Sequence, residues 1–151
     1  MDKKTNLFLT IYMGIVFSIV FTVVGGLLNG FDWAAIPVQF LVGLVVGVAV
    51  GLIIPVGEIG GAVAAKLCQP GTPGFTFVMF NVILLLMLLF MCPIMTVIFG
   101  CVLGGAPLSA VLPGAYSTFM PFYIPGSIVL QLIGNKVAAL AAKTAHPKGR
   151  P

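Results

Sequence analysis

The stretch FTFVMFNVILLLMLLFMCPIMTVIFG, residues 75–100, decides the fold class. It runs for 26 residues without a charged side chain, whereas a helix needs only about 20 predominantly apolar residues to cross the hydrocarbon core of a bilayer. Three other stretches, at about 7–28, 36–56 and 110–133, are apolar in the same way. The sequence therefore predicts an all-α membrane protein with four transmembrane helices.

The composition of the whole chain agrees with this prediction. Of its 151 residues, 60% are hydrophobic and 7% are charged, whereas soluble domains carry about 25% charged residues. The formal net charge is +4, but the basic residues are scattered between apolar runs and form no patch of the kind that binds nucleic acid. We therefore expect the lipid bilayer, and not nucleic acid, as the surroundings of the chain.

Turn-forming residues divide the chain into two helical hairpins. The Pro/Gly-rich turn at 69–74 separates them, and we expect the second span to continue as a helix through Lys66 before this turn. The predicted segments are a first hairpin at 1–68 with spans at about 7–28 and 36–56, the turn at 69–74, a second hairpin at 75–142 with spans at about 75–100 and 110–133, and a basic tail at 143–151.

The basic residues predict the orientation. The two loops at 29–35 and 101–109 contain none, and their only charged residue is Asp32, next to Trp33. All seven basic residues fall on the other side, in the N-terminus, the middle connection and the tail: Lys3, Lys4, Lys66, Lys136, Lys143, Lys148 and Arg150. Because basic residues are retained on the cytoplasmic side, both termini are predicted to be cytoplasmic.

The two hairpins share an internal repeat. Each contains an Ile-Pro pair followed ten residues later by a lysine. The matched pairs are Met13 with Met87, Thr22 with Thr96, Gly26 with Gly100, Ile54 with Ile124, Pro55 with Pro125, and Lys66 with Lys136. Since both hairpins enter from the same side, the repeats would be parallel and related by a pseudo-twofold axis along the membrane normal.

Small residues recur every fourth position in the first two spans. Such stripes let helix backbones approach closely in lipid, where no hydrophobic force drives helices together. We predict that they pack the helices, and two further uses stay open: homodimerisation, or the lining of a narrow path. The stripe residues are Gly14, Ser18, Thr22 and Gly26 in the first span, and Gly43, Gly47 and Gly51 in the second.

The fourth span is rich in proline at its centre. Pro121 and Pro125 would each remove a helical hydrogen bond, and Pro93 would free the carbonyl of Leu89 in the third span. Interrupted helices near the membrane midplane are a common feature of transporter binding sites; a simple kink satisfied by neighbouring hydroxyls is the alternative. The predicted solute or ion path combines this centre with nearby polar groups: Cys92, Thr96, Ser117, Pro121, Tyr123 and Pro125.

Glu58 is the one acidic residue close to a predicted span. A carboxylate at the bilayer centre is costly and usually functional, but a helix starting near Ile36 brings Glu58 to the cytoplasmic boundary, where it stays hydrated. Asn81 and Gln131 should lie at a similar depth. The three could form a polar cluster that gates the path or couples it to a cation or proton.

Catalytic chemistry has no basis in the sequence. The only histidine, His146, lies in the tail, and paired carboxylates and phosphate-binding loops are absent. The three cysteines and this histidine do not make a metal-binding motif. We expect neither enzymatic activity nor a metal or other cofactor.

The sequence also resembles a known family. The segment 6–28 with Ile54, Pro55 and Lys66, and the segment 81–100 with Ile124, Pro125 and residues 131–134, resemble a small bacterial two-helix membrane unit catalogued as domain of unknown function 2798, here in tandem. The resemblance implies a location in the bacterial inner membrane and no established activity. It carries over no site residues.

Two functions follow from these observations. The first is a small transporter or channel-like protein for a small solute or ion, acting as a homo-oligomer because four short spans enclose little space by themselves. The second is a non-transporting accessory or assembly protein that docks a larger membrane protein through its small-residue helix faces.

Overall fold

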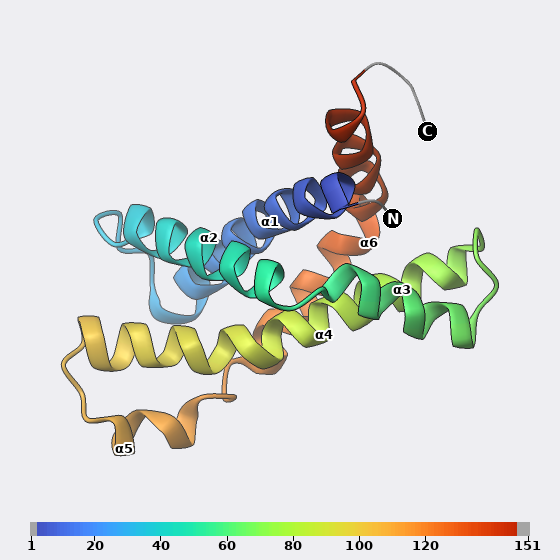
Figure 1. Cartoon of the computed structure of the whole chain (residues 1–151). Coiled ribbons are helices and arrows are strands. Elements are labelled where there is room, and N and C mark those ends of the chain that lie inside the picture. The colour runs from blue at the N-terminus through green and yellow to red at the C-terminus, as the bar shows by residue number, and fades with distance from the viewer. Residues whose placement is uncertain (1–2, 148–151) are drawn as a thin grey trace.

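The computed structural model describes residues 3–147, which are helical apart from short connections (Figure 1). Four stretches are long and apolar enough to cross a membrane: Lys3–Asn29, Ile36–Ile53, Pro73–Leu103 and Phe119–Ala145. This agrees with the predicted all-α, multi-pass membrane protein. The elements are α1 (Lys3–Asn29), α2 (Ile36–Ile53), α3 (Val56–Leu67), α4 (Pro73–Val97), the π-helical turn η1 (Ile98–Leu103), α5 (Leu108–Val111), the 3-10 turn η2 (Leu112–Gly114) and α6 (Phe119–Ala145).

Local sequence signals account for several helix ends. After α1, Gly30 adopts a positive φ of 82°, a conformation that side chains with a β-carbon rarely tolerate. Pro37 stands in the first turn of α2, where no helical N–H bond is lost. At the start of α4, Thr72 Oγ1 accepts a hydrogen bond of 3.2 Å from the backbone N–H of Phe75, which caps the helix.

The helices α1 and α2 meet through their small residues. A β-carbon added at Gly47 would lie 3.6 Å from the Cα of Gly14, and one added at Gly51 would lie 2.5 Å from Thr10 Cγ2. Gly43 faces Ser18, whose hydroxyl donates to a backbone carbonyl of α2. The two stripes therefore pack α1 against α2 within one chain. Every predicted stripe residue is buried: Gly14, Ser18, Thr22, Gly26, Gly43, Gly47 and Gly51.

The prediction that the second span continues as one helix to Lys66 is wrong. The span stops at Ile53, because Pro55 interrupts the hydrogen-bond ladder, and α3 begins at Val56. The new helix packs tightly on α4, since a β-carbon at Gly60 would lie 3.0 Å from the backbone oxygen of Met79. The chain then turns at 68–72 and enters α4.

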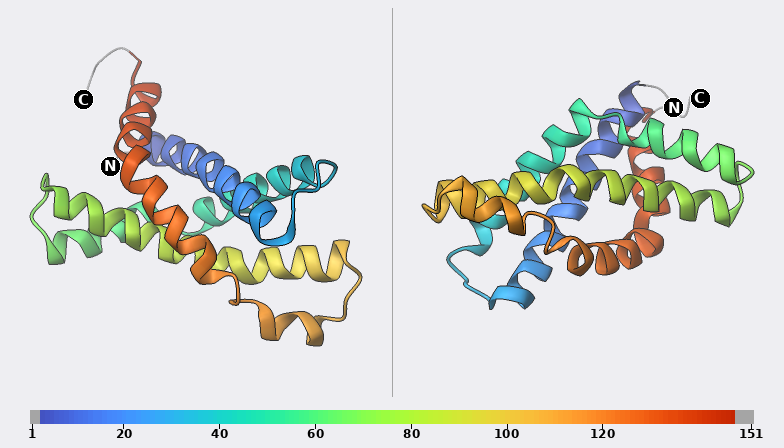
Figure 2. Two further views of the ribbon diagram at one scale, coloured as in Figure 1. Left: turned by 180° about the vertical axis from the view of Figure 1, so that it is seen from behind. Right: turned by 90° about the horizontal axis from the view of Figure 1, so that it is seen from below.

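The long helix α4 lies at the centre of the molecule. It contacts α2, α3 and α6, and the right panel of Figure 2 shows it crossing the whole assembly. Side chains of α4 accordingly dominate the core. Seven of them are at most 2% exposed: Phe80, Ile83, Leu84, Met87, Leu88, Met91 and Cys92.

The predicted fourth span at 110–133 is wrong in its boundaries. After a turn containing Gly105, with φ of 69°, the chain folds back as the short elements α5 and η2 and then passes through hydrogen-bonded turns at 115–118 that form no continuous helix. A single helix, α6, follows and continues to Ala145, beyond the predicted end of the span at 133 and into the first three residues of the predicted tail. Pro121 lies in the first turn of α6, where its missing N–H costs nothing, so it is not the interruption. Pro125 alone lies inside that helix.

The two ends of the bundle differ. Both described chain ends and the α3–α4 turn lie at one end, and the α1–α2 and α4–α5 connections lie at the other (Figures 1 and 2). The Tyr12 and Thr144 hydroxyls, 3.1 Å apart, join the end of α6 to the first half of α1. Five basic residues belong to the end that holds the chain termini: Lys3, Lys4, Lys66, Lys136 and Lys143. Lys148 and Arg150 fall outside the described residues.

The proposed repeat has unequal local structures in the two halves. Pro55 ends a helix, whereas its counterpart Pro125 lies within the uninterrupted α6. The second half instead breaks at 115–118, a position where the first half has the continuous helix α2. The internal repeat therefore stays a prediction from the sequence.

Candidate functional site

The turn at 115–118, which separates η2 from the fourth crossing α6, lies against the middle of the third crossing. Pro113 and Gly114 precede the non-helical residues 115–118, and both residue types disfavour a continuing helix. Leu89, which the turn contacts, is near the midpoint of the 31-residue span Pro73–Leu103. Non-helical backbone at such a depth is tolerated only where protein or enclosed water satisfies its polar groups.

The α4 helix and the turn satisfy each other's backbone groups. Pro93 leaves the carbonyl of Leu89 without its helical partner, and the Tyr116 hydroxyl donates to this oxygen over 3.2 Å. In return, Thr96 Oγ1 lies 3.5 Å from the carbonyl oxygen of Ala115 while donating within α4 over 2.7 Å. The Leu89 carbonyl that Pro93 was predicted to free therefore binds Tyr116 and holds the turn at 115–118 against α4.

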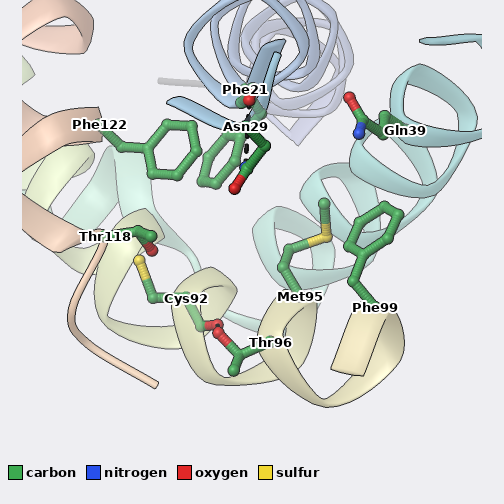
Figure 3. A pocket seen from close by; sticks show the side chains of 10 residues that line it. Phe21, Asn29, Gln39, Cys92, Met95, Thr96, Phe99, Thr118 and Phe122 are labelled. Atoms are coloured by element: carbon green, nitrogen blue, oxygen red, sulfur yellow. Dashed lines mark hydrogen bonds between the residues drawn. The ribbon is translucent and has the colours of Figure 1, made fainter. Parts of the chain in front are cut away.

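A pocket of about 290 Å³ lies beside this turn. Four segments form it: the last turns of α1, the start of α2, the end of α4 with η1, and the start of α6 (Figure 3). It therefore belongs to the half of the bundle away from the chain termini. Its lining residues are Phe21, Gly25, Asn29, Gln39, Cys92, Met95, Thr96, Phe99, Thr118 and Phe122.

The pocket combines an aromatic wall with neutral polar groups. The Phe21 and Phe122 rings stack with centroids 4.2 Å apart. The Asn29 side-chain amide N–H donates a hydrogen bond to the Gly25 carbonyl, so its amide oxygen is available to accept one from another group. The half-buried Gln39 side chain has no hydrogen-bond partner among residues 3–147. No charged side chain lines the pocket.

The pocket ends against the closed core. Along α4, the pocket residues Cys92 and Thr96 are separated from the polar residue Asn81 by a tightly packed segment. Cys92 itself is 2% exposed, and its Sγ faces Thr118 (Figure 3). The separating side chains are at most 2% exposed: Leu84, Met87, Leu88 and Met91. A single chain in this conformation therefore has a pocket on one side and a barrier below it.

A second polar cluster joins α4 to α6 beyond this barrier. Asn81 Oδ1 accepts hydrogen bonds from the Tyr123 hydroxyl at 3.0 Å and from Ser127 Oγ at 2.9 Å. Its Nδ2 donates 2.8 Å to the carbonyl of Phe77, which Gln131 Nε2 also approaches, at 3.4 Å. Tyr123 therefore belongs to this cluster and not to the pocket beside Cys92.

Glu58 is not part of either cluster. It lies exposed in the first turn of α3, where a negative charge suits the helix dipole. It makes no hydrogen bond or ion pair with any residue in the described part of the chain. The predicted grouping of Glu58 with Asn81 and Gln131 thus holds for the two amides, which share the Phe77 carbonyl, and no contact joins Glu58 to them.

The other predicted path residues are dispersed. Ser117 is exposed and donates 2.7 Å to the Gly114 carbonyl inside its own turn. Pro125 lines a separate, wholly apolar groove between α1 and α6. Pro121 lines neither space. Only Cys92 and Thr96 of the predicted path residues line the pocket.

Sequence reasoning missed four pocket residues that carry its chemistry: Asn29, Gln39, Thr118 and Phe122. A usable signal existed for Gln39, because it is the one polar side chain in the apolar run 36–56. Asn29 follows the first predicted span, so the sequence is equally consistent with a loop residue that has no role in a site. Phe122 reads as ordinary membrane-helix composition, and nothing in the sequence brings it to Phe21.

Groups that could hold a metal do not gather in this structure. Among residues 3–147 no three His, Cys, Asp or Glu side chains come together, and the three cysteines are all free. The pocket therefore offers neutral hydrogen bonds and aromatic surface. No family model matches the chain, and neither a curated protein nor a solved structure matches it.

Proposed function

We propose that this protein is a small transporter or channel-like protein of the bacterial inner membrane, with both termini cytoplasmic. One observation carries the proposal: the turn at 115–118, which precedes the fourth crossing α6, lies against the middle of α4, near the membrane midplane, and borders a polar-lined pocket. Discontinuous helices at this depth form the binding sites of many transporters, because their unwound backbone is available to the solute path.

The barrier below the pocket fits alternating access. A carrier exposes its site to one side at a time, and here the pocket lies in the half away from the basic chain ends. Ten residues of α4 lie between Asn81 and Cys92, and the 11 steps from one to the other span about 16 Å of helix. Transport would require α6 and the turn to move relative to α4, exchanging the closed side.

An oligomer is part of the proposal. The four crossings leave many large apolar side chains exposed, including Leu41 and Val45 of α2 and Ile124 of α6, and lipid or a second copy can cover them. The interior of one chain is filled at its centre. In a homo-oligomer, a second copy would support α6 and the turn at 115–118 as they move.

Flux into liposomes tests the proposal. Purified protein is reconstituted and assayed with protons, monovalent cations, and uncharged solutes such as urea, glycerol and acetamide. We expect flux of at least one of these above that of protein-free liposomes. Absence of flux for the whole panel, with the protein folded and inserted, would overturn the proposal.

Two glycine substitutions make this test specific. A β-carbon at Gly25 has open space, with Gln39 Oε1 as its nearest neighbour at 3.9 Å, so Gly25→Leu fills the pocket without a clash. Gly61, in α3, also has room for a side chain and lies outside the pocket. We expect Gly25→Leu to abolish flux and the matched Gly61→Leu to retain it.

The accessory-protein hypothesis needs a docking surface other than the small-residue faces of α1 and α2. The stripes of α1 and α2 are occupied by each other, so a partner would have to bind elsewhere. Isolation from native membranes discriminates: a stoichiometric partner together with no flux would favour an accessory role over transport.

A further inference from the structure

We infer that the pocket binds a small uncharged solute that carries both an apolar part and an amide-like or hydroxyl group. The inference rests on the proposed function for its transport role, and on the pocket's own chemistry for its ligand class. Three features of the lining support it: an amide without a partner, an absence of charge, and an aromatic wall.

The first feature is the Gln39 side chain. It lies in the first turns of α2, is half-buried and lines the pocket, yet no residue in the described chain bonds to its amide group. Its polar atoms are not sealed in the protein interior, because every buried side-chain N or O atom of the described residues has a partner, so the amide is open to a hydrogen-bonding molecule that enters the pocket. Its carbonyl and NH₂ could accept from and donate to the same solute.

The second feature is the absence of charge. None of the lining residues is charged, and their side chains are amide, hydroxyl, thiol, thioether and aromatic groups. Asp32, in the adjoining α1–α2 connection, is exposed and accepts a hydrogen bond from the backbone N–H of Ala34 in its own loop. An ion that enters a poorly hydrated pocket loses its hydration, and without an opposite charge that loss is not repaid. The pocket therefore selects against ammonium, carboxylate and phosphate groups.

The third feature is the stacked pair of Phe21 and Phe122, which joins α1 to the beginning of α6. Together with Met95 and Phe99 it gives the pocket apolar surface beside the amides of Asn29 and Gln39 (Figure 3). The volume of about 290 Å³ is at the lower limit for ligand pockets. A solute with a short apolar portion and one hydrogen-bonding end fits this combination of apolar surface and amide groups.

Cys92 supplies a native probe of the pocket. In a Cys68→Ser, Cys101→Ser background it is the only thiol of the chain. Three methanethiosulfonates of similar size carry a neutral hydroxyethyl, an anionic sulfonatoethyl or a cationic trimethylammonioethyl group. The protein in liposomes is treated with each, and modification of Cys92 is followed by mass spectrometry. We expect the neutral reagent to react at least about tenfold faster than either ion, which corresponds to about 1.4 kcal/mol of discrimination.

Two controls separate the pocket from general reactivity. Protein unfolded in detergent and denaturant should react with all three reagents, with their relative rates there used as the reference. Gly25→Leu should suppress modification of Cys92 by the neutral reagent, and Gly61→Leu should not. Equal relative rates for neutral and charged reagents would overturn the ligand class, and so would a failure of the neutral reagent to modify the folded protein.

The outcome is independent of the flux experiment. Selective modification without flux would leave a binding pocket in a protein that does not transport. Flux with unselective modification would keep transport and remove the preference for uncharged solutes. The two failures are therefore distinguishable.

Discussion

In the first hairpin, glycines bring the backbones of α1 and α2 together, whereas in the second hairpin Gly126 and Gly134 of α6 face side chains of α4, and amide, phenol and hydroxyl side chains add hydrogen bonds between the two helices. Backbone contacts through glycine allow no change of spacing without loss of packing. Hydrogen bonds between long side chains can be exchanged for others as helices shift. The comparison indicates a fixed first half and a second half built to rearrange.

The interrupted segment strengthens this contrast. Residues 104–118 return along α4, yet Ala115 is their only buried residue, at 4% exposure. Val111 packs against Gly100, and Tyr116 supplies the hydrogen bond to Leu89. Segments with few buried contacts open at low free-energy cost, so this segment is the part of the molecule best suited to move.

The largest effect is expected from Gly47→Leu in the fixed half. The β-carbon would already lie 3.6 Å from the Cα of Gly14 and 3.7 Å from Met91 Cε, so the rest of a leucine has no space. Overpacking of this kind costs about 1–3 kcal/mol, and we expect the upper part of that range. Reversible unfolding in mixed micelles measures it. Gly61→Leu is the control, since its side chain meets open space.

The fold class and most span positions could be predicted from the sequence because lipid imposes a simple requirement, a long apolar run, and residues 75–100 satisfy it plainly. The stripe at Gly43, Gly47 and Gly51 was equally legible, since glycine has few other reasons to recur at this spacing. Its partner surface on α1 was not specified by the sequence, and only the structure shows that the two stripes meet.

The fourth crossing could not be placed correctly, for a physical reason. A proline in the first turn of a helix and one that breaks a helix look identical in a sequence, and Pro121 proved to be of the first kind. The pocket was missed because its residues come from four segments whose packing is non-local. Gln39 was missed as well, although a lone amide in an apolar run was a usable signal.

A smaller effect is expected from Asn81→Leu in the adjustable half. The change removes the acceptor of Tyr123 and Ser127 but keeps a branched side chain of similar length, and leucine has a higher helix propensity than asparagine. Hydrogen bonds between membrane helices contribute about 0.6 kcal/mol each on average, so the loss should be about 1–2 kcal/mol. The same unfolding measurement applies, and a double-mutant cycle with Ser127→Ala isolates the pair. A cost above that of Gly47→Leu would reverse the comparison.

The smallest effect on stability, with a large effect on access, is expected from Tyr116→Phe. The substitution removes only the hydroxyl that binds the Leu89 carbonyl, and the ring is already 52% exposed. A net loss of about 0.5–1 kcal/mol should follow, close to the resolution of the unfolding measurement. If Tyr116 holds the segment closed, the same free energy raises the population of the open form about two- to fivefold, and neutral-reagent modification of Cys92 should accelerate by that factor. Tyr12→Phe is the matched control, because it removes a hydroxyl contact to Thr144 at the opposite end of the bundle. Equal acceleration in both variants would mean that the bundle loosens as a whole and that its halves do not differ.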